Sequence, residues 1–402
     1  KSFDGGNHWT TIFAGSEYAN VSLDFNTNYK GWLLSSRTIN TTTDGGLTWD
    51  IPLGLDNDTY NCVGFLNNNT GWILGGTESF EMSPFFKTNN GGVNWNKIFV
   101  DYKMFNSIYK NDSIMYATGL TADYTGFIMK SNQSGTLDIV YSLANNTFYG
   151  INFINKYTGY VVGKNGIILK TTDISQSWNI QTSPSSQENY SVYFIDSLKG
   201  WIVGNREYGL YGDLLKTTNG GTNWTIQMQF NTFLKDIKFI DKNIGWIVGG
   251  NGTILFTTNS GNNWNYYPKF IGFSFESIYF KDNKTGWLLG RNGLLLRTDN
   301  CGGLVSVLNI TTELPSKYSL SQNYPNPFNP TTKMRFDVVH SGDVKIVVYD
   351  IMGREVQTLV NESLKPGTYE TSFDGSHLSN GVYLYQMTAG DISETKKMLL
   401  IK

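Results

Sequence analysis

The sequence is poor in charge, cysteine and histidine, and it contains no long hydrophobic run. Only 16% of its 402 residues are charged, with 31 basic against 33 acidic side chains and a formal net charge of -2. Without a basic excess there is no electrostatic field to attract nucleic acid or an anionic membrane. No apolar run approaches the roughly 20 residues that a membrane-spanning helix needs. We therefore expect neither a nucleic-acid partner nor a transmembrane segment.

The scarcity of cysteine and histidine excludes several classes of site. Cys62 and Cys301 occupy different parts of the repeat described below, and neither has a second cysteine at CxxC spacing. A disulfide framework or a redox motif is therefore not expected. His8, His340 and His377 are far apart in the sequence and from any carboxylate motif, so no zinc site or catalytic triad can be assembled. The sequence predicts no metal, no cofactor and no identifiable catalytic residue.

Aromatic residues make up 15% of the chain, and many of them recur at a fixed period. One cassette repeats: an apolar stretch, Gly-Trp with a short apolar run, Lys-Thr-Thr, a glycine-rich turn and a second tryptophan. The turn positions are Trp9, Trp49, Trp95, Leu137 in a degenerate copy, Trp178, Trp224 and Trp264. A second ladder runs in phase at Gly31-Trp32, Gly71-Trp72, Gly159-Tyr160, Gly200-Trp201, Gly245-Trp246 and Gly286-Trp287. A period of roughly 40 to 46 residues is the length of a four-stranded propeller blade.

Each period contains short runs rich in β-branched and aromatic residues, separated by Gly, Asn and Asp clusters, which is typical of strands and turns. In the last full unit we expect strands at 277–280, 287–289 and 294–298. Seven such sets lie between residues 21 and 298. Residues 1–13 begin inside a turn motif, so they supply either the outer strand of the last blade or part of a longer ring. The sequence thus predicts an all-β fold with a β-propeller of seven, or alternatively eight, blades.

The turn Thr42-Thr43-Asp44-Gly45-Gly46-Leu47-Thr48-Trp49 resembles the Asp-box of the bacterial neuraminidase repeat. Its combination with Gly-Trp-x-x-Gly is similar to the propellers of photosystem II assembly factors and their non-photosynthetic relatives. In such a turn a short acidic side chain caps its own backbone, glycines adopt positive φ, and the tryptophan packs between blades. We therefore interpret the following residues as part of the fold and not as catalysts: Asp4, Asp44, Trp49, Trp95, Asp173, Trp178, Trp224 and Trp264.

The period stops after residue 303, and the remaining chain has a different pattern. We expect the propeller to occupy residues 1–310, a linker 311–317 and a second domain 318–402. Prolines are dense just after residue 324, so this segment must lie extended. Six strands are expected after it, at 333–339, 344–349, 354–360, 367–373, 381–388 and 393–401. About 85 residues of such strands predict a small immunoglobulin-like β-sandwich.

This second domain resembles the type A C-terminal sorting domain of the type IX secretion system of Bacteroidetes and related phyla. The motif residues are Asn323, Pro325, Asn326, Pro327, Gly353, Gly367, Gly381, Tyr383, Lys396 and Lys397. The resemblance implies two partners, the secretion translocon and a sortase-like peptidase that removes the domain. It also implies export through the periplasm to the outer-membrane surface or the extracellular space. The alternative is a fused adhesion sandwich.

A ligand is expected on the face formed by the loops between the second and third strands of each blade, which we call the top face. These loops vary in length, and variable loops on a rigid ring usually mark a binding face. The predicted site, for a protein or glycan ligand, consists of Arg37, Lys164, Arg206, Arg291, Tyr124, Tyr208 and Tyr211. Converging basic residues could hold a carboxylate or an anionic glycan. Alternatively, each is a solvated loop residue that pairs with a local carboxylate such as Asp213 or Glu207.

Three functions remain open from the sequence. The first is an exported propeller that binds a protein or glycan without catalysis, because the repeat accounts for nearly every distinctive residue. The second is a sialidase-like glycoside hydrolase or lyase, for which Arg37, Arg206 and Arg291 invite comparison with an arginine triad. The Tyr-Glu nucleophile pair and the Arg-Ile-Pro motif of sialidases are not recognisable in the sequence. The third is a chaperone for a photosynthetic complex, against which the sorting domain argues.

Overall fold

The computed structural model describes residues 9–13, 19–50, 53–55, 59–76, 83–100, 103–111, 113–132, 135–173, 175–185, 187–206, 210–267, 273–282, 284–299, 308–309, 315–364, 366–375 and 378–402. The chain forms two compact units, Lys1–Gly302 and Gly303–Lys402. Throughout the described ranges the chain is β-structure and loops, with one 3-10 turn, η1 (Lys164–Gly166), and no α-helix. The all-β prediction is confirmed.

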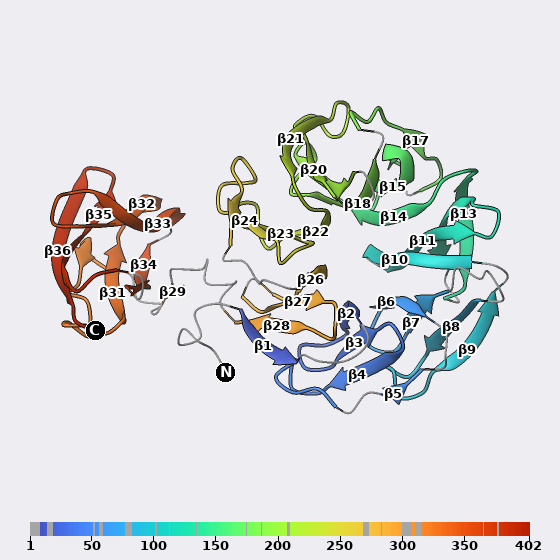
Figure 1. Ribbon diagram of the computed structural model, residues 1–402, viewed down its shortest axis with the longest axis horizontal. Coiled ribbons are helices and arrows are strands. Elements are labelled where there is room, and N and C mark those ends of the chain that lie inside the picture. The colour runs from blue at the N-terminus through green and yellow to red at the C-terminus, as the bar shows by residue number, and fades with distance from the viewer. Residues whose placement is uncertain are drawn as a thin grey trace. The chain divides into compact units, whose positions relative to one another are not determined.

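Within its described residues, the first unit consists of seven four-stranded antiparallel sheets around a common centre (Figure 1). We number these blades 1 to 7 in chain order. Their innermost strands are β2 (Asn20–Phe25), β6 (Tyr60–Phe65), β10 (Lys103–Asn111), β14 (Phe148–Phe153), β18 (Glu188–Phe194), β22 (Leu234–Phe239) and β26 (Phe275–Phe280). The second strands are β3 (Gly31–Ser35), β7 (Gly71–Gly75), β11 (Ile114–Thr121), β15 (Gly159–Gly163), β19 (Gly200–Asn205), β23 (Gly245–Gly249) and β27 (Gly286–Gly290).

The outer half of each blade is shorter and more exposed. The third strands are β4 (Thr38–Thr42), β8 (Ser83–Thr88), β12 (Gly126–Ser131), β16 (Ile168–Thr171), β20 (Gly212–Thr217), β24 (Ile254–Thr257) and β28 (Leu295–Thr298). The outermost strands are β5 (Leu53–Gly54), β9 (Asn96–Val100), β13 (Leu137–Leu143), β17 (Asn179–Ile180), β21 (Thr225–Phe230), β25 (Asn265–Tyr266) and, in blade 7, β1 (Thr10–Phe13). The second strands are buried along their whole length, except for the two half-buried ends of β11. This burial explains the unbroken apolar runs after each Gly-Trp.

The ring closes by a strand from the N-terminal end of the chain. β1 pairs antiparallel with β28, with Thr10 opposite Arg297 and Thr11 opposite Leu296. The side chain of Asn20 in blade 1 also donates to the Leu294 carbonyl of blade 7, at 3.1 Å. Closure of this kind covers a sheet edge that would otherwise be exposed. The sequence left two alternatives for residues 1–13, and the structure has the seven-bladed one.

One aromatic arrangement recurs at the boundaries between blades. Trp201, from the second strand of blade 5, stacks on Phe239 of blade 6 at 4.8 Å between ring centroids. Phe239 in turn meets the edge of Trp264, the Asp-box tryptophan of blade 6, at 5.7 Å. Offset stacking and edge-to-face contacts are the favoured geometries of aromatic pairs. Equivalent trios are Trp32–Phe65–Trp95, Tyr116–Phe153–Trp178, Tyr160–Phe194–Trp224 and Trp287–Phe25–Trp49.

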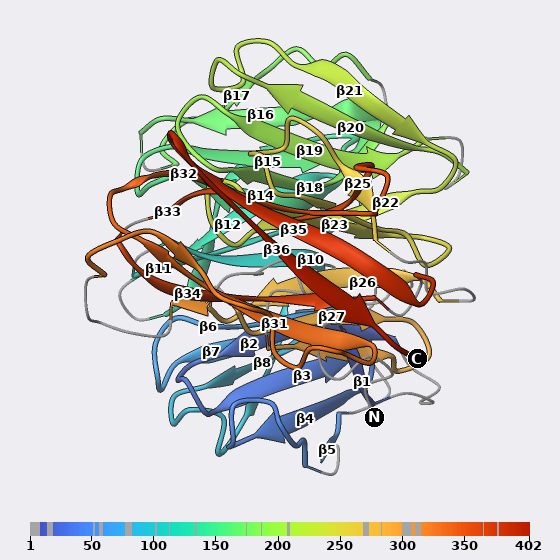
Figure 2. The same ribbon diagram turned by 90° about the vertical axis from the view of Figure 1, so that its left-hand side faces the viewer.

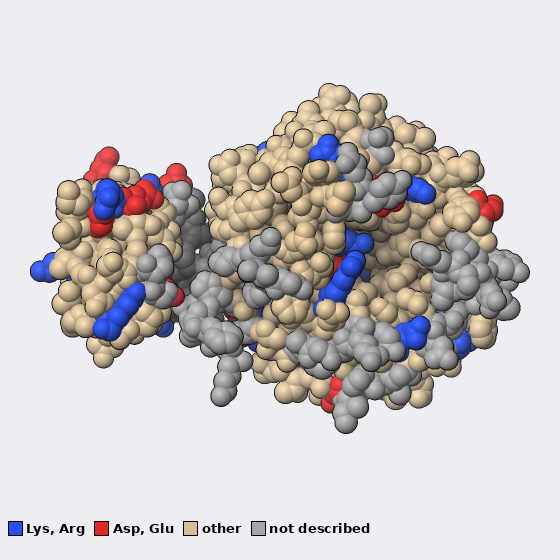
Figure 3. All heavy atoms as spheres, viewed as in Figure 1, with Lys and Arg blue, Asp and Glu red and all other residues tan. Residues whose placement is uncertain are grey.

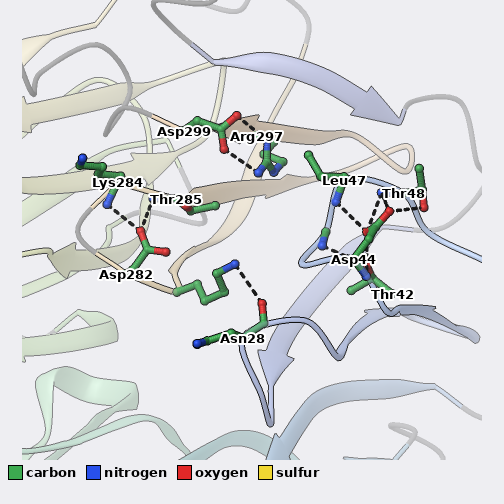
Figure 4. Close-up of polar contacts among 12 residues, drawn as sticks. Asn28, Thr42, Asp44, Leu47, Thr48, Asp282, Lys284, Thr285, Arg297 and Asp299 are labelled. Carbon is green, nitrogen blue, oxygen red and sulfur yellow. Dashed lines mark hydrogen bonds and ion pairs between the residues drawn. The ribbon is translucent and has the colours of Figure 1, made fainter.

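The Asp-box aspartates hold their own turns. Asp44 accepts hydrogen bonds from the backbone of Leu47 and Thr48 and from the hydroxyls of Thr42 and Thr48 (Figure 4). Hydrogen bonds from Thr48, the largest cause, hold the pKa of Asp44 well below its usual range. Asp173 makes the same contacts, and hydrogen bonds from Ser177 lower its pKa to about 2. Asp4, in the first turn motif, lies outside the described residues.

The last glycine of this turn is required by the neighbouring blade. Gly46 has a φ of +82°, and a Cβ added there would lie 2.5 Å from the Trp287 ring of blade 7. Gly92, with a φ of +75°, faces Trp32 of blade 1 in the same way. A side chain at either position would therefore strain the backbone and displace the aromatic trio.

The second unit is a sandwich of two four-stranded sheets (Figure 2). One sheet contains β30 (Ser319–Leu320), β31 (Thr331–Val338), β34 (Gly367–Asp374) and β29 (Leu308–Asn309). The other contains β33 (Glu355–Leu364), β32 (Gly342–Tyr349), β35 (Gly381–Ala389) and β36 (Ile392–Leu400). Alternate side chains of both sheets meet in one core. All six strands predicted in this domain are present.

The boundary between the units differs from the one expected at residue 310. β29 pairs with β34, with Leu308 opposite Glu370 and Asn309 opposite Tyr369. This pairing draws residues 308–309 into the second unit. Part of the expected linker, 311–314, lies outside the described ranges.

The proline-rich segment closes one edge of the sandwich. Asn323 is 2% exposed, and its amide donates to the Pro325 carbonyl and to Thr332 Oγ1, both at 3.0 Å. Phe328 is also buried and bridges to Leu400, next to the end of the last strand. The motif residue Asn326 accepts a bond from the Leu399 backbone at 2.9 Å. The segment therefore takes the place of regular strand pairing at this edge.

The remaining motif residues shape turns and edges. Gly353 and Gly381 have φ of +78° and +156°, in turns where a side chain would be strained. Tyr383 donates to the Ser379 carbonyl at 2.8 Å. Lys396 pairs with Glu394, and Gly367 begins β34. Pro327 and Lys397 are exposed.

We predict that the aromatic trios dominate the stability of the propeller. Phe65 is 3% exposed and stacks on Trp32 at 3.9 Å, so Phe65→Ala should lower the free energy of unfolding by about 3–5 kcal/mol. Tyr29 is 69% exposed, and Tyr29→Ala should change it by less than about 0.5 kcal/mol. Urea denaturation of both variants checks this. Equal effects would show that the trios are not the main contact.

A second prediction concerns Asp24, which joins three blades at the ring closure. Its carboxylate accepts from the Phe65 backbone of blade 2 at 2.7 Å and from Tyr279 of blade 7 at 3.4 Å. Burial raises the pKa of Asp24 to about 6, while the backbone bonds from Phe65 and Phe25 oppose the shift. Because the folded state binds this proton more tightly than the unfolded chain, the resulting stabilisation is greatest below pH 4 and is lost through pH 6.

The measurement compares the wild type with Asp24→Asn by urea denaturation between pH 4 and pH 7. The stability of the wild type relative to the variant should fall by up to about 3 kcal/mol over this range. Carboxylates whose pKa is lowered, such as Asp44, contribute with the opposite sign but cancel in the comparison. A difference that stays constant with pH would show that Asp24 has an ordinary pKa.

Candidate functional site

The innermost strands enclose a central channel of about 870 Å³. In the space-filling view the propeller is hollowed at its centre, and basic side chains gather there beside acidic ones (Figure 3). Each innermost strand carries a β-bulge near its start. Bulges commonly re-aim side chains next to functional sites. We call the bulged residues the bulge ring: Val21, Asn61, Asn106, Tyr149, Tyr190, Lys235 and Glu276, all of which line the channel.

The bulge ring has a structural half and a chemically richer half. In blades 2 and 3, the side-chain amides of Asn61 and Asn106 donate to the Phe105 and Phe148 carbonyls of the next blade, at 2.8 and 2.9 Å. These bonds tie neighbouring blades together. Blades 4 to 7 carry two tyrosines, a lysine and a glutamate at the same positions. Within the bulge ring, phenols and charged side chains therefore lie on one side only.

Glu188 forms the centre of a hydrogen-bond cluster on that side. Tyr190 donates to its Oε2 at 2.8 Å and Tyr149 to its Oε1 at 3.4 Å. Asn205 donates to the same carboxylate at 3.4 Å. Burial, with the nearby Glu188 charge, raises the pKa of both tyrosines well above the usual range. Both phenols are therefore neutral hydrogen-bond donors, and their rings, 5.3 Å apart, are held by the shared carboxylate.

A second charged pair continues around the mouth. The Lys235 ammonium lies 4.0 Å from the Tyr190 ring centroid and 3.8 Å from Glu276 Oε2. Arg291 Nε binds the other oxygen of Glu276 at 2.6 Å. A cation over an aromatic face is attracted by the ring quadrupole, more strongly when partly desolvated. Acidic and basic groups thus alternate from Glu188 through Lys235 and Glu276 to Arg291, already positioned by one another.

The basic residues predicted from the sequence lie on separate blades, and none lines the channel. Arg291 reaches the mouth through Glu276, with its side chain 59% exposed. Arg206 lies 3.8 Å from Asp213 and over the Tyr211 ring at 5.4 Å, so it matches the alternative of local pairing. Arg37 is exposed in its loop, and Lys164 is exposed at the start of η1.

The predicted aromatic residues are also dispersed. Tyr124 is 59% exposed at the tip of a turn, with a φ of +58°. Tyr211 is half-buried under Arg206, and Tyr208 lies outside the described residues. No Tyr-Glu pair is recognisable in the sequence, whereas the structure brings Tyr190 and Glu188 into hydrogen-bond contact.

Sequence reasoning missed Tyr149, Tyr190, Lys235 and Glu276. Their common signal is position, because each lies one or two residues into an innermost strand, where the repeat has no fixed residue. The described residues contain no group of three or more side chains that could ligate a metal. Nor does any described segment form a helix long and apolar enough to cross a membrane.

Comparison with known proteins agrees with both units. Residues 3–136, 128–231 and 225–327 match the family described as photosynthesis system II assembly factor YCF48. Residues 322–402 match the secretion system C-terminal sorting domain. A curated relative, the photosystem II assembly lipoprotein Ycf48 of Synechococcus sp. (strain CC9902), is 23% identical over 262 residues, which are 61% of this chain and 74% of the relative.

Solved structures share the propeller fold. The structure of YCF48 bound to D1 peptide has a TM-score of 0.57 at 23% identity, covering 72% of this chain and 96% of its own. YCF48 from Cyanidioschyzon merolae has a TM-score of 0.58 at 17% identity, covering 72% and 98%. The WD40 propeller of Doa1 has a TM-score of 0.55 at 12% identity, covering 73% and 97%.

The sorting domain implies the use of a secretion machinery and export to the cell surface or the extracellular space. With its propeller and this tail, the protein is a secreted propeller protein. The chain belongs to the photosynthesis system II assembly factor YCF48 family and carries a secretion system C-terminal sorting domain.

Proposed function

We propose that this exported propeller binds a polypeptide segment of another protein at the channel mouth of blades 4 to 7. The observation that carries the proposal is the cluster of Glu188, Tyr190, Lys235, Glu276 and Arg291. These groups are fixed by mutual contacts at 2.6 to 4.0 Å. A site whose side chains are already ordered loses little entropy when a partner binds.

The chemistry of the mouth suits a peptide better than a compact apolar ligand. A peptide offers backbone amides and carbonyls, which match hydrogen-bonding groups of both kinds, and charged side chains, which match alternating charges. The two half-buried tyrosines provide rigid contact area at low entropic cost. A solved relative is described as bound to a D1 peptide, which supports a peptide ligand for a propeller of this family.

Binding tests should focus on Lys235. A surface-protein and peptide array, probed with the full chain, would identify binding segments. Lys235→Ala should weaken capture of these segments by at least about tenfold, since it removes the cation that joins Tyr190 to Glu276. Lys242→Ala is the matched control, because Lys242 is an exposed lysine in the loop at the opposite end of the same innermost strand. Equal capture by Lys235→Ala and Lys242→Ala would contradict the proposal.

A second candidate function is glycoside hydrolysis, favoured by the contact between Tyr190 and Glu188. In a tyrosine-nucleophile mechanism the phenol oxygen attacks the anomeric carbon and a carboxylate takes the phenol proton, while the glycosidic bond breaks and the aglycone leaves. Water then hydrolyses the tyrosyl glycoside and releases the sugar. The raised pKa of Tyr190 means that it needs such a base at neutral pH. Release of 4-methylumbelliferone from its glycosides, lost in Tyr190→Phe, would favour this function. Retention of turnover in Tyr190→Phe would count against it.

We further propose that the translocon recognises the folded sandwich. β36 is paired with β35 and buries Met398 and Leu400. Removing residues 396–402 should leave the edge of β35 unpaired and expose the core between the two sheets. In a host with a type IX system, the truncated protein should accumulate in the periplasm with a folded propeller. The control is Thr395→Asp, an exposed site on the same strand. Efficient surface display of the truncated protein would disprove recognition of the folded sandwich.

A further inference from the structure

A second hollow lies on the top face, away from the channel. It has a volume of about 140 Å³ and lies between the loop that follows β21 in blade 5 and the turn after β23 in blade 6. The residues around it are Asn231, Thr232, Asn251, Gly252, Thr253, Ile254, Tyr266 and Tyr267. None of them lines the channel, so the hollow is independent of the channel mouth.

The hollow contains a polar group that the described protein does not satisfy. Thr232 is 8% exposed, and no hydrogen-bond partner of its Oγ1 lies within the described part of the chain. A buried hydroxyl without a partner costs about 1–3 kcal/mol. Such a group in a native structure calls for a ligand or a water that completes its bonding.

An aromatic ring stands at the edge of the same hollow. Tyr266, on the outermost strand β25, is 67% exposed. Its ring meets Phe230 edge to face at 6.3 Å between centroids, and Phe230 is itself buried. This contact orients the Tyr266 ring. An exposed ring held in this way offers a flat surface for stacking.

The polar groups of the rim are neutral. Asn231 and Asn251 are exposed on opposite sides, one from each blade. A side-chain amide offers one acceptor and two donor hydrogens, which suits adjacent hydroxyls. None of the described residues that line the hollow carries a charge. The hollow is therefore suited to an uncharged ligand with many hydroxyl groups.

We propose that this hollow binds a single neutral sugar residue of a glycan. The apolar face of the sugar ring would stack on Tyr266, and its hydroxyls would bond to the two asparagine amides and to Thr232 Oγ1. A hollow of about 140 Å³ is small, and it is suited to one sugar ring and not to a chain of them. An anion would find no cation among the described lining residues, and an apolar ligand would leave Thr232 unsatisfied.

The experiment uses saturation-transfer NMR on the full chain with the methyl glycosides of glucose, galactose, mannose, fucose and N-acetylglucosamine. At least one should receive saturation from the protein. Two variants then locate the site. Tyr266→Ala removes the stacking surface, and Thr232→Val removes the hydroxyl at nearly constant volume without leaving a new buried polar group. Each should weaken binding of that glycoside by at least about tenfold, with an unchanged melting temperature.

Tyr29→Ala provides the control, because Tyr29 is an equally exposed tyrosine in a loop of blade 1 on the opposite face. It should leave the affinity unchanged. Failure of all five glycosides to bind would overturn the proposal. So would an affinity within twofold of the wild type in either Tyr266→Ala or Thr232→Val. Loss of peptide capture in Lys235→Ala bears only on the channel mouth, so the two sites can be tested separately.

Discussion

The propeller depends on one contact, the stack between an aromatic residue of one blade and a phenylalanine of the next. At Trp32 and Phe65 the rings are 3.9 Å apart, and neither is more than 3% exposed. The Asp-box tryptophan closes the group from the side, at 5.8 Å from Phe65 in blade 2. Because the trio uses residues from two successive blades, no blade can complete its core alone. The ring must close for the last trio to form.

The junction between blades 2 and 3 shows how the trio residues depend on one another. Blade 3 has Lys110 where the other blades have phenylalanine, and Leu137 where they have the Asp-box tryptophan. Both aromatic partners are absent together, which is expected if neither is useful without the other. Trp72 of blade 2 packs instead among a broader apolar cluster that includes Phe105 and Phe127. Packing of comparable size thus replaces the regular trio at this junction.

The same physics explains what the sequence could predict. Trio residues recur at nearly equal spacing, because nearly every junction imposes the same demand, and this periodicity predicts the strands and the blades. It left open whether residues 1–13 close the ring or belong to a longer one. The fold does not require the same residue types at the positions that line the channel. Tyr190, Lys235 and Glu276 occupy equivalent positions in three blades but differ in chemistry. Their proximity follows from the ring geometry and from a bulge that has no sequence marker, so only the structure could place them together. The basic loop residues, by contrast, were conspicuous in the sequence but are dispersed.

The fold constrains other positions of the innermost strands, so the bulge ring is available for function. The residue four positions after the bulge of each innermost strand is phenylalanine, apart from Lys110, because it stacks on the preceding blade. The glycines of the Asp-box are held by the preceding blade as well. The bulged residue is free of both constraints, because its side chain points into the channel. Blades 2 and 3 use it for an inter-blade bond, whereas blades 4 to 7 place tyrosines and charges there. The charged half of the mouth also links neighbouring blades, through Tyr149 and Glu188 and through Lys235 and Glu276, but it does so with charged groups. Charged groups at these positions carry a desolvation cost that the asparagine amides of blades 2 and 3 avoid, and this difference supports the proposed binding of a partner at the mouth.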